Sequence, residues 1–115
     1  MRLDLETPLT VGIEERGPDV LVFLSGELDH WTAGKVVDAL DDALWRSGPG
    51  SIVVDASELW FIDSGGLTAF IHGTAAARAR GGDLVIVGAR PMLIRLVETL
   101  RIGHLLTLRE SAVAA

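Results

Sequence analysis

Apolar and polar residues alternate along the first part of the chain and then give way to an unbroken apolar run. Residues 9–15 alternate, residues 16–19 contain Gly-Pro, and residues 20–24 are all apolar. Alternation is typical of a strand with one face in solvent, whereas a short apolar run is typical of a buried strand. The pattern therefore predicts a hairpin of one half-exposed and one buried strand. Two later apolar runs, 52–54 and 84–87, predict two more buried strands.

Three segments carry apolar residues at helical spacing. The first begins near Ala33, with Asp29 or Thr32 as its expected cap, and ends at Ser47-Gly-Pro-Gly. The second is expected from Gly66 to Arg80, and the third from Pro91 to just before Gly103. The residues expected to be buried are Ala33, Val36, Val37, Leu40 and Leu44 in the first helix, Leu67, Phe70, Ile71, Thr74 and Ala75 in the second, and Leu93, Leu96, Val97 and Leu100 in the third.

The elements follow the order β-β-α-β-α-β-α, and residues 105–108 are a candidate for a final short edge strand. Strands that alternate with helices form parallel sheets through crossover connections. The prediction is a single α/β domain over residues 1–115, with its core at about 9–108, a mixed and mainly parallel sheet flanked by helices, and frayed ends at Ser111–Ala115.

The loops that follow the second, third and fourth strands leave the same edge of the predicted sheet. These loops are residues 26–32, 55–66 and 88–90. Because the carboxyl ends of parallel strands meet at one edge, the three loops are expected to converge, and sites of open α/β sheets form there.

Composition narrows the class of protein. The chain has 115 residues, of which 49% are hydrophobic and 23% charged, and this balance suits a folded domain. It has no cysteine, which excludes disulfides, thiol catalysis and the common structural zinc sites. No apolar run approaches the roughly 18 residues of a membrane span, and the first residues lack the pattern of a signal peptide. We expect a cytoplasmic protein with no direct membrane insertion.

The net charge of −6 is divided unevenly along the chain. Residues 1–63 hold 13 acidic and 4 basic side chains, a net −9, whereas residues 64–115 hold 3 acidic and 6 basic ones, a net +3. The division is either scattered solvated charge or an acidic surface that steers a basic protein partner. No cluster of Lys or Arg forms the basic stripe of a nucleic-acid binder, so no nucleic-acid partner is expected.

The segment Asp55-Ala-Ser-Glu-Leu-Trp-Phe-Ile-Asp-Ser-Gly-Gly-Leu67 carries the most distinctive chemistry. Ser64 lies between Asp63 and two glycines at the start of a predicted helix, where it is expected to be exposed. The free N–H groups and the positive dipole end of a helix favour a negative charge. Ser64 is therefore a candidate to carry a phosphoryl group. The alternative is that Ser64 or Asp63 simply caps the helix.

Hydrolytic and nucleotide-binding interpretations fit this segment poorly. The nucleophile elbow requires Gly-x-Ser-x-Gly, and Ile62 stands where the first glycine belongs. None of the three histidines, His30, His72 and His104, has an evident orienting acid. The P-loop pattern is absent, and Lys35 is the sole lysine.

Metal binding at the shared edge is another weak candidate. Asp29, Asp55 and Asp63 could converge there, but no histidine pattern accompanies them, and such aspartates more often cap turns and helix starts. We expect no catalytic residue, no metal and no cofactor.

The three tryptophans are candidates for different roles. If Trp60 alternates with buried Phe61 or Ile62, it points outward and can anchor a partner, and the alternative is an inward core tryptophan. Trp31 and Trp45 flank the first predicted helix and are expected to pack there.

Two motifs together resemble the STAS domains of bacterial anti-sigma factor antagonists. They are Gly26-Glu-Leu-Asp29 followed by Thr32, and Ile62–Leu67 preceded by Asp55-x-Ser57. The resemblance covers roughly residues 9–108, in the same order of elements. It departs at Gly65, where many members carry a second Ser or Thr, and at Trp60, where a smaller or polar residue is usual. The expected partner-binding residues are Asp29, Thr32, Trp60, Asp63, Ser64, Gly65 and Gly66.

The resemblance also implies a mechanism. In this family the unphosphorylated protein binds an anti-sigma factor that is also a serine kinase, and this frees a sigma factor. The kinase phosphorylates the serine that matches Ser64, and a serine phosphatase reverses the modification. The chain is then a regulator and not an enzyme, and a monomer or weak dimer. The alternative is a non-switched STAS scaffold subunit of a stress-sensing or membrane-transport complex.

Overall fold

A computed structural model describes residues 8–110 of the chain, so the expected fraying of residues 111–115 lies outside the described residues. The elements in chain order are β1 (Leu9–Arg16), β2 (Asp19–Leu28), α1 (Ala33–Ser47), β3 (Ile52–Ile62), α2 (Ser64–Ala79), β4 (Leu84–Val87), α3 (Pro91–Leu100), the 3₁₀ turn η2 (Gly103–Leu105) and β5 (Thr107–Arg109).

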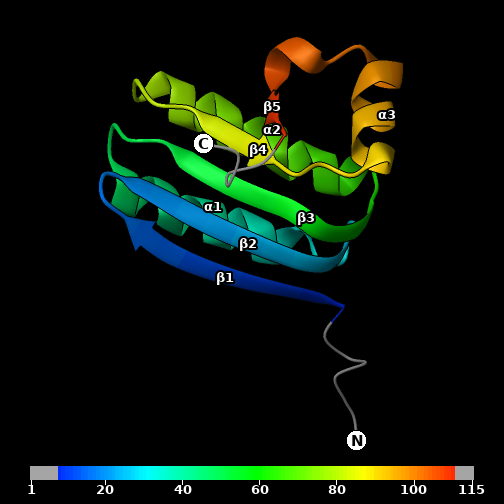
Figure 1. Cartoon of the computed structure of the whole chain (residues 1–115), viewed down its shortest axis with the longest axis horizontal. Coiled ribbons are helices and arrows are strands. Elements are labelled where there is room, and N and C mark those ends of the chain that lie inside the picture. Colours follow the sequence, from blue (N-terminus) through cyan, green and yellow to red (C-terminus); the bar gives the residue numbers. More distant parts are fainter. Residues whose placement is uncertain (1–7, 111–115) are drawn as a thin grey trace, which may run out of the picture.

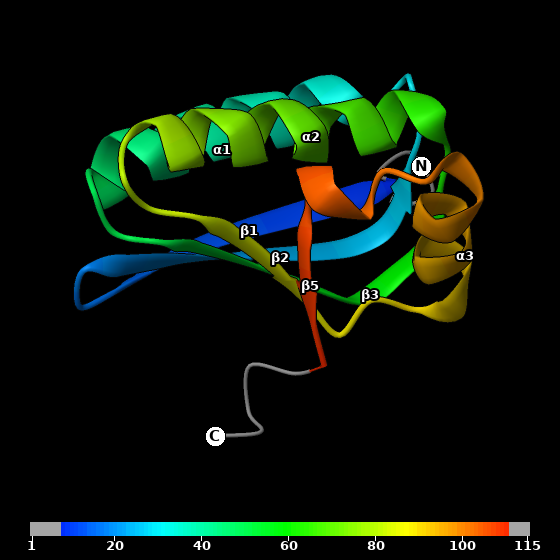
Figure 2. The same cartoon turned by 90° about the horizontal axis from the view of Figure 1, so that it is seen from above.

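The strands form one sheet in the order β1-β2-β3-β4-β5. β1 is antiparallel to β2, and the remaining neighbours are parallel. Figures 1 and 2 show α1 and α2 side by side on one face of the sheet, with α3 at the end where the parallel strands finish. This is the predicted α/β architecture, and the final short strand is present as β5.

The core lies between this face of the sheet and the two helices. Alternate residues of β2, β3 and β4 point into it and meet the apolar stripes of α1 and α2. Its central members include Val22, Val54, Ile86, Leu40 and Phe70, all nearly or fully buried. Each such side chain contributes about 1.5–3 kcal/mol on burial, so this cluster determines how the helices sit on the sheet.

The helical spacing predicted the direction of each buried stripe but overstated its width. Val37, Ala75 and Leu100 were expected to be buried, yet all three are exposed. A helix that packs on one face of a sheet buries only a narrow arc, and these residues lie at its margin. In α3, for example, Leu93 and Val97 are buried while Leu100 faces solvent.

β2 and β3 are longer than the sequence predicted, and part of the expected loop 55–66 is strand. β3 continues from the predicted run 52–54 to Ile62. The pairing of β2 with β3 shifts register at two places within residues 23–27. These bulges break the alternation, so the buried residues Leu59 and Ile62 are three positions apart instead of two.

The expected packing of two tryptophans around α1 is wrong. Trp31 is 81% exposed and Trp45 is 80% exposed. Trp31 lies in the turn before α1, and Trp45 lies on the solvent side of the helix, because the residues that face the core are its neighbours Ala43 and Leu44.

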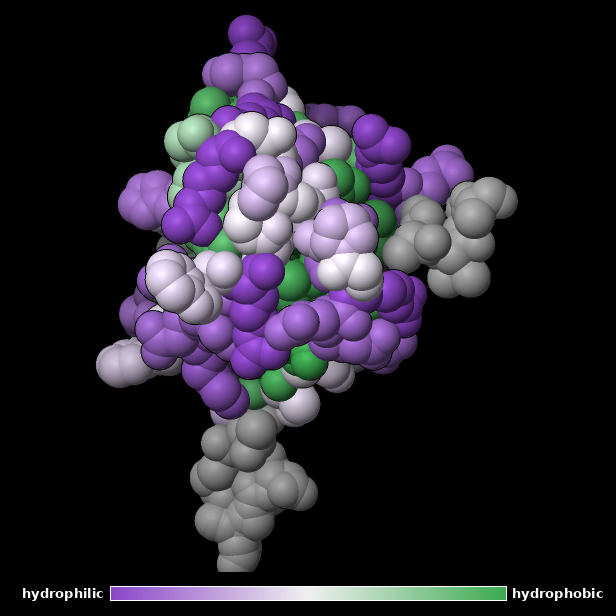
Figure 3. Space-filling model, turned by 90° about the vertical axis from the view of Figure 1, so that its left-hand side faces the viewer, coloured by the Kyte–Doolittle hydropathy of each residue, from purple (hydrophilic) through white to green (hydrophobic). Residues whose placement is uncertain are grey.

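The surface at the end of the molecule that carries the β1–β2 turn is mainly hydrophilic. Figure 3 shows that hydrophobic residues reach this surface only in small separate spots. Within residues 8–110, the helices are all too short or too polar to cross a bilayer.

Candidate functional site

The turn between β2 and α1 is held by Asp29 and Thr32. The Asp29 carboxylate accepts hydrogen bonds from the N–H groups of Trp31 and Thr32, at 2.9 and 3.0 Å. The Thr32 hydroxyl donates to the Glu27 carbonyl at 2.9 Å and accepts from the Asp29 N–H at 2.9 Å. Thr32 occupies the N-cap position of α1, but its side chain makes no hydrogen bond to the helix. The pair therefore stabilises the turn before the helix.

The same hydrogen bonds fix a negative charge in this turn. Desolvation raises the pKa of Asp29, but the hydrogen bonds donated by Thr32 and Trp31 outweigh it and hold that pKa below its ordinary value. Asp29 is consequently ionised at neutral pH.

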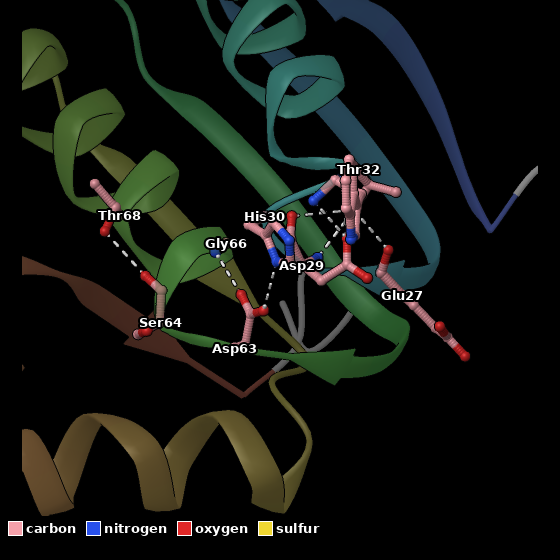
Figure 4. Close-up of polar contacts among 9 residues, drawn as sticks. Glu27, Asp29, His30, Thr32, Asp63, Ser64, Gly66 and Thr68 are labelled. Atoms are coloured by element: carbon pink, nitrogen blue, oxygen red, sulfur yellow. Dashed lines mark hydrogen bonds and ion pairs between the residues drawn. The ribbon is translucent and has the colours of Figure 1, made fainter.

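The structure shows which residue caps α2. Asp63 is the N-cap, and its carboxylate accepts a hydrogen bond from the Gly66 N–H at 2.9 Å. Ser64 is the first residue of the helix and is exposed. Its carbonyl accepts from the Thr68 hydroxyl at 2.9 Å, while its own hydroxyl makes no hydrogen bond within residues 8–110. Figure 4 shows Asp63 between Ser64 and His30, with Thr68 one turn further along α2. The Ser64 hydroxyl is thus left available to solvent.

Close backbone packing brings the β2–α1 turn and the start of α2 together. The Asp63 N–H donates to the Leu28 carbonyl at 3.2 Å. A Cβ added to Gly66 would lie 2.5 Å from Leu28 Cγ and 2.7 Å from the Leu28 carbonyl oxygen, so only glycine fits there. His30 Nδ1 lies 3.8 Å from Asp63 Oδ2, beside Gly65 (Figure 4). The predicted convergence of these two segments is confirmed.

The loop after β4 reaches the same edge through Arg90. The Arg90 guanidinium lies 3.9 Å from the centroid of the Trp60 ring, and Nη1 donates to the Ser57 carbonyl at 3.4 Å. Trp60 is 57% exposed, so it points outward, as one of the two sequence interpretations held. A guanidinium over an exposed ring contributes about 0.5–1 kcal/mol and limits the motion of the side chain. Sequence reasoning missed the role of Arg90, because its partner Trp60 lies on a different element of the chain.

The aspartates at this edge are each engaged by their own turn or helix. Asp55 accepts hydrogen bonds from the N–H and the hydroxyl of Ser57, at 2.9 and 2.7 Å. Asp29 serves the turn before α1, and Asp63 caps α2. In the part of the chain that the structure describes, no group of three or more His, Asp or Glu side chains is arranged to hold a metal ion.

The candidate residues divide into exposed and buried members. Ser64 and Trp60 are exposed, and Asp29, Asp63 and Gly65 are half-buried, whereas Thr32 and Gly66 are buried. Two further side chains at this edge escaped sequence reasoning, the exposed pair His30 and Trp31, whose ring centroids are 4.8 Å apart. The edge combines an exposed hydroxyl, carboxylates and protruding aromatic side chains, which is the composition of a surface that another protein can cover.

These features define a class of protein. The chain belongs to the STAS domain family, because a family model described as "Mlab, STAS domain" matches residues 11–108. An anti-sigma-B factor antagonist of Listeria monocytogenes is 30% identical over 103 residues, which cover 88% of this chain and 89% of the relative. An anti-sigma F factor antagonist of Paenibacillus polymyxa is 31% identical over 90 residues, or 78% and 77% of the two chains. The resemblance predicted from the two motifs is confirmed.

Solved structures share the fold. An anti-sigma factor antagonist from Mycobacterium paratuberculosis superposes with a TM-score of 0.79 at 23% identity, over 90% of this chain and 87% of that one. The unphosphorylated form of the anti-sigma factor antagonist SpoIIAA gives 0.70 at 18% identity, over 90% of both chains. The phosphorylated form of SpoIIAA from Bacillus gives 0.68 at 18% identity, over 87% and 91%.

Proposed function

We propose that this chain is an anti-sigma factor antagonist whose binding to its partner is switched by phosphorylation of Ser64. One observation carries the proposal: Asp63 caps α2, so the exposed Ser64 hydroxyl has no capping role and can be modified. The curated relatives are named as antagonists of anti-sigma factors, which supports a partner of that class.

The start of α2 can carry a phosphoryl group without unfolding. A phosphoserine adds about −1.5 to −2 charges and three strong acceptors. The helix dipole at that position offsets about 0.3–1 kcal/mol of its cost. Because the cap is formed by the neighbouring Asp63, the modification leaves the Gly66 hydrogen bond in place.

Phosphorylation of Ser64 would weaken partner binding much more than it would destabilise the fold. The ionised Asp29 carboxylate already places a negative charge at this edge, and phosphoserine would add to that charge. An unmatched or like charge at an interface costs several kcal/mol, and such a cost lowers affinity by about a hundredfold or more. The expected result is release of the partner from a folded domain.

The roles of the candidate residues follow from their exposure. Trp60, Ser64, Asp63, Asp29 and Gly65 would contact the partner. Buried Thr32 and Gly66 would instead hold the β2–α1 turn and the start of α2 in place. The chain itself performs no catalysis on this proposal. Its modifying enzymes are a serine kinase and a serine phosphatase of the cytoplasm.

The test compares Ser64→Asp with Ser64→Ala, and Ser25→Asp, which adds the same charge at an exposed serine of β2, serves as the matched control. Binding to a candidate anti-sigma factor is measured by calorimetry, and folding by thermal melting. We expect Ser64→Asp to lose about a hundredfold in affinity with an unchanged melting temperature. Ser64→Ala and Ser25→Asp should bind like the native chain. Equal affinity for Ser64→Asp and Ser64→Ala would show that the switch is absent.

The modification itself is tested by incubating the native chain with ATP and candidate kinases and mapping phosphate by mass spectrometry. Phosphate on Ser64 is expected. A partner that binds while Ser64 is never modified would favour the alternative, a non-switched STAS scaffold subunit.

A further inference from the structure

A groove between α1 and α2 lies outside the edge that carries Ser64. It has a volume of about 260 Å³ and opens to solvent. Its lining includes Val37, Asp41 and Leu44 of α1, and Ala69, His72 and Ala76 of α2. On the α2 side the lining combines the small residues Ala69, Gly73 and Ala76 with His72.

Val37 lines the groove, and Trp45, further along α1, lies outside its lining; both are exposed apolar side chains. Val37 is 41% exposed and Trp45 is 80% exposed. They lie eight positions apart on α1, which is about 12 Å along the helix axis. Asp41 lies midway between them and belongs to the same row, since residues four apart share a helix face. Exposed apolar side chains of this size next to a groove are typical of a docking surface.

The α1 side of the groove carries carboxylates that have no cation of their own. Among the nearby cations, Arg46 pairs with Asp42 and Glu15, while Lys35 and Arg80 donate to backbone carbonyls of β1 and α1. Asp38 and Asp41 have no ion-pair partner within residues 8–110. An occupant of the groove should therefore combine apolar and basic side chains.

The helix α3 of this chain has that combination. Its half-exposed apolar row consists of Met92, Leu96 and Leu100, with Met92 43% and Leu100 47% exposed. The row covers eight positions, the same 12 Å or so as the row on α1. Arg95 lies beside the row and Arg101 follows its last residue, and neither has an ion-pair partner in the described part of the chain. Glu98 is also exposed, but helical periodicity places it further round the helix from the row than Arg95.

We propose that α3 of one copy of this chain docks in the α1/α2 groove of a second copy. The two surfaces match in length and apolar character, and the carboxylates Asp38 and Asp41, which have no ion-pair partner within residues 8–110, would face Arg95 and Arg101. The two patches are different, so a single contact leaves one groove and one α3 free in the pair. A two-fold arrangement of the copies forms the contact twice and closes the pair, and other arrangements extend it into rings or open chains. A single helix in a groove buries less than the roughly 1,200–2,000 Å² of a stable interface. The association should therefore be weak and concentration-dependent, and added salt should reduce it.

The test measures self-association of the full chain by sedimentation velocity, at concentrations up to about 1 mM, the range of a weak interface. Two charge reversals probe the two surfaces, Asp41→Arg in the groove and Arg95→Glu on α3. Each variant alone places like charges against each other in its own copies, and self-association should fall about tenfold or more. An equimolar mixture pairs opposite charges again and should restore it. Glu58→Arg, an exposed charge reversal on β3 at a residue with no ion-pair partner within residues 8–110, is the matched control and should associate like the native chain.

Circular dichroism confirms that the variants are folded before they are compared. A native chain that stays monomeric at every concentration overturns the proposal and leaves the groove to a different protein. Association that ignores both reversals, or a mixture that associates no better than its two components, also overturns it, because the copies would then meet through other surfaces.

Discussion

Gly66→Ala tests the close packing that brings the start of α2 against the β2–α1 turn. The added Cβ would lie 2.5 Å from Leu28 Cγ, 2.7 Å from the Leu28 carbonyl oxygen and 3.2 Å from its carbon. Leu28 is fully buried and cannot swing into solvent. Its carbonyl also accepts the Asp63 N–H at 3.2 Å, so relief of the clash requires α2 to move away from β2.

The cost of this movement can be compared with the gain from alanine. Alanine stabilises a helix by about 1 kcal/mol relative to glycine. Against this, overpacking costs about 1–3 kcal/mol. Displacement of the Gly66 N–H weakens the Asp63 cap, and loss of such a cap costs about 0.5–2 kcal/mol. The clash and the cap together exceed the gain, and we expect a net loss of about 2 kcal/mol in the free energy of unfolding. For a chain of this size, the melting temperature should fall by about 8 °C.

The loss is measured by urea denaturation and by thermal melting, with Gly65→Ala as the matched control. A Cβ on Gly65 would meet His30 Cβ at 3.1 Å, His30 Cα at 3.3 Å and Asp63 Oδ1 at 3.3 Å, and a shift of a few tenths of an ångström in the exposed turn at His30 relieves these contacts. The control should therefore stay within about 0.5 kcal/mol of the native chain. If Gly66→Ala unfolds at the same urea concentration as Gly65→Ala, the close approach of α2 to Leu28 is not what assembles this edge.

Four further changes probe other contacts. Arg90→Ala removes the guanidinium from Trp60 and should weaken partner binding about threefold without lowering the melting temperature; Trp60→Ala should weaken it more, and an equal loss of stability would contradict the anchor role. Asp29→Ala removes two hydrogen bonds to backbone N–H groups and should cost about 0.5–1.5 kcal/mol in urea denaturation; an unchanged midpoint would contradict this. Desolvation raises the pKa of Asp83, but the hydrogen bonds that its carboxylate accepts, first that from Thr107, outweigh desolvation and hold this pKa below its ordinary value of 3.8. Ionised Asp83 therefore stabilises the fold above pH 3.8, and this stabilisation is lost as the pH falls through the lowered pKa. Asp83→Asn should flatten this part of the acid-unfolding curve, and a curve of unchanged slope would refute the assignment.

The order of the elements could be predicted from the sequence because each buried strand is a short apolar run and each helix has one apolar stripe. The length of β3 could not be predicted. Its second half, residues 55–62, pairs with bulged β2 and so loses the alternation that identifies a strand. The exposure of Val37 and Leu100 was also misjudged, since spacing gives the direction of a buried stripe but tertiary packing decides its width.

The candidate site was predicted in part. The spacing of the motifs placed Ser64 at a helix start and near Asp29, but it could not decide between Asp63 and Ser64 as the cap, because both residue types cap helices. The contact between Arg90 and Trp60 joins segments 30 positions apart in the chain, and no local pattern announces such a pair. Thr32 matches the family motif, yet only the structure shows that its hydroxyl is directed into the turn and away from solvent.

The strand order has a consequence for the kind of ligand this edge can take. In many α/β proteins the order of the strands reverses within the sheet, and the crevice that opens at this topological switch point holds a nucleotide or another small molecule. In the described part of this chain each strand lies beside its predecessor, from β1 to β5, so the order never reverses. The carboxyl edge thus acquires no crevice from its topology, and Ser64 stands on open surface. For the proposed function, this leaves the exposed Ser64 open to the face of another folded protein.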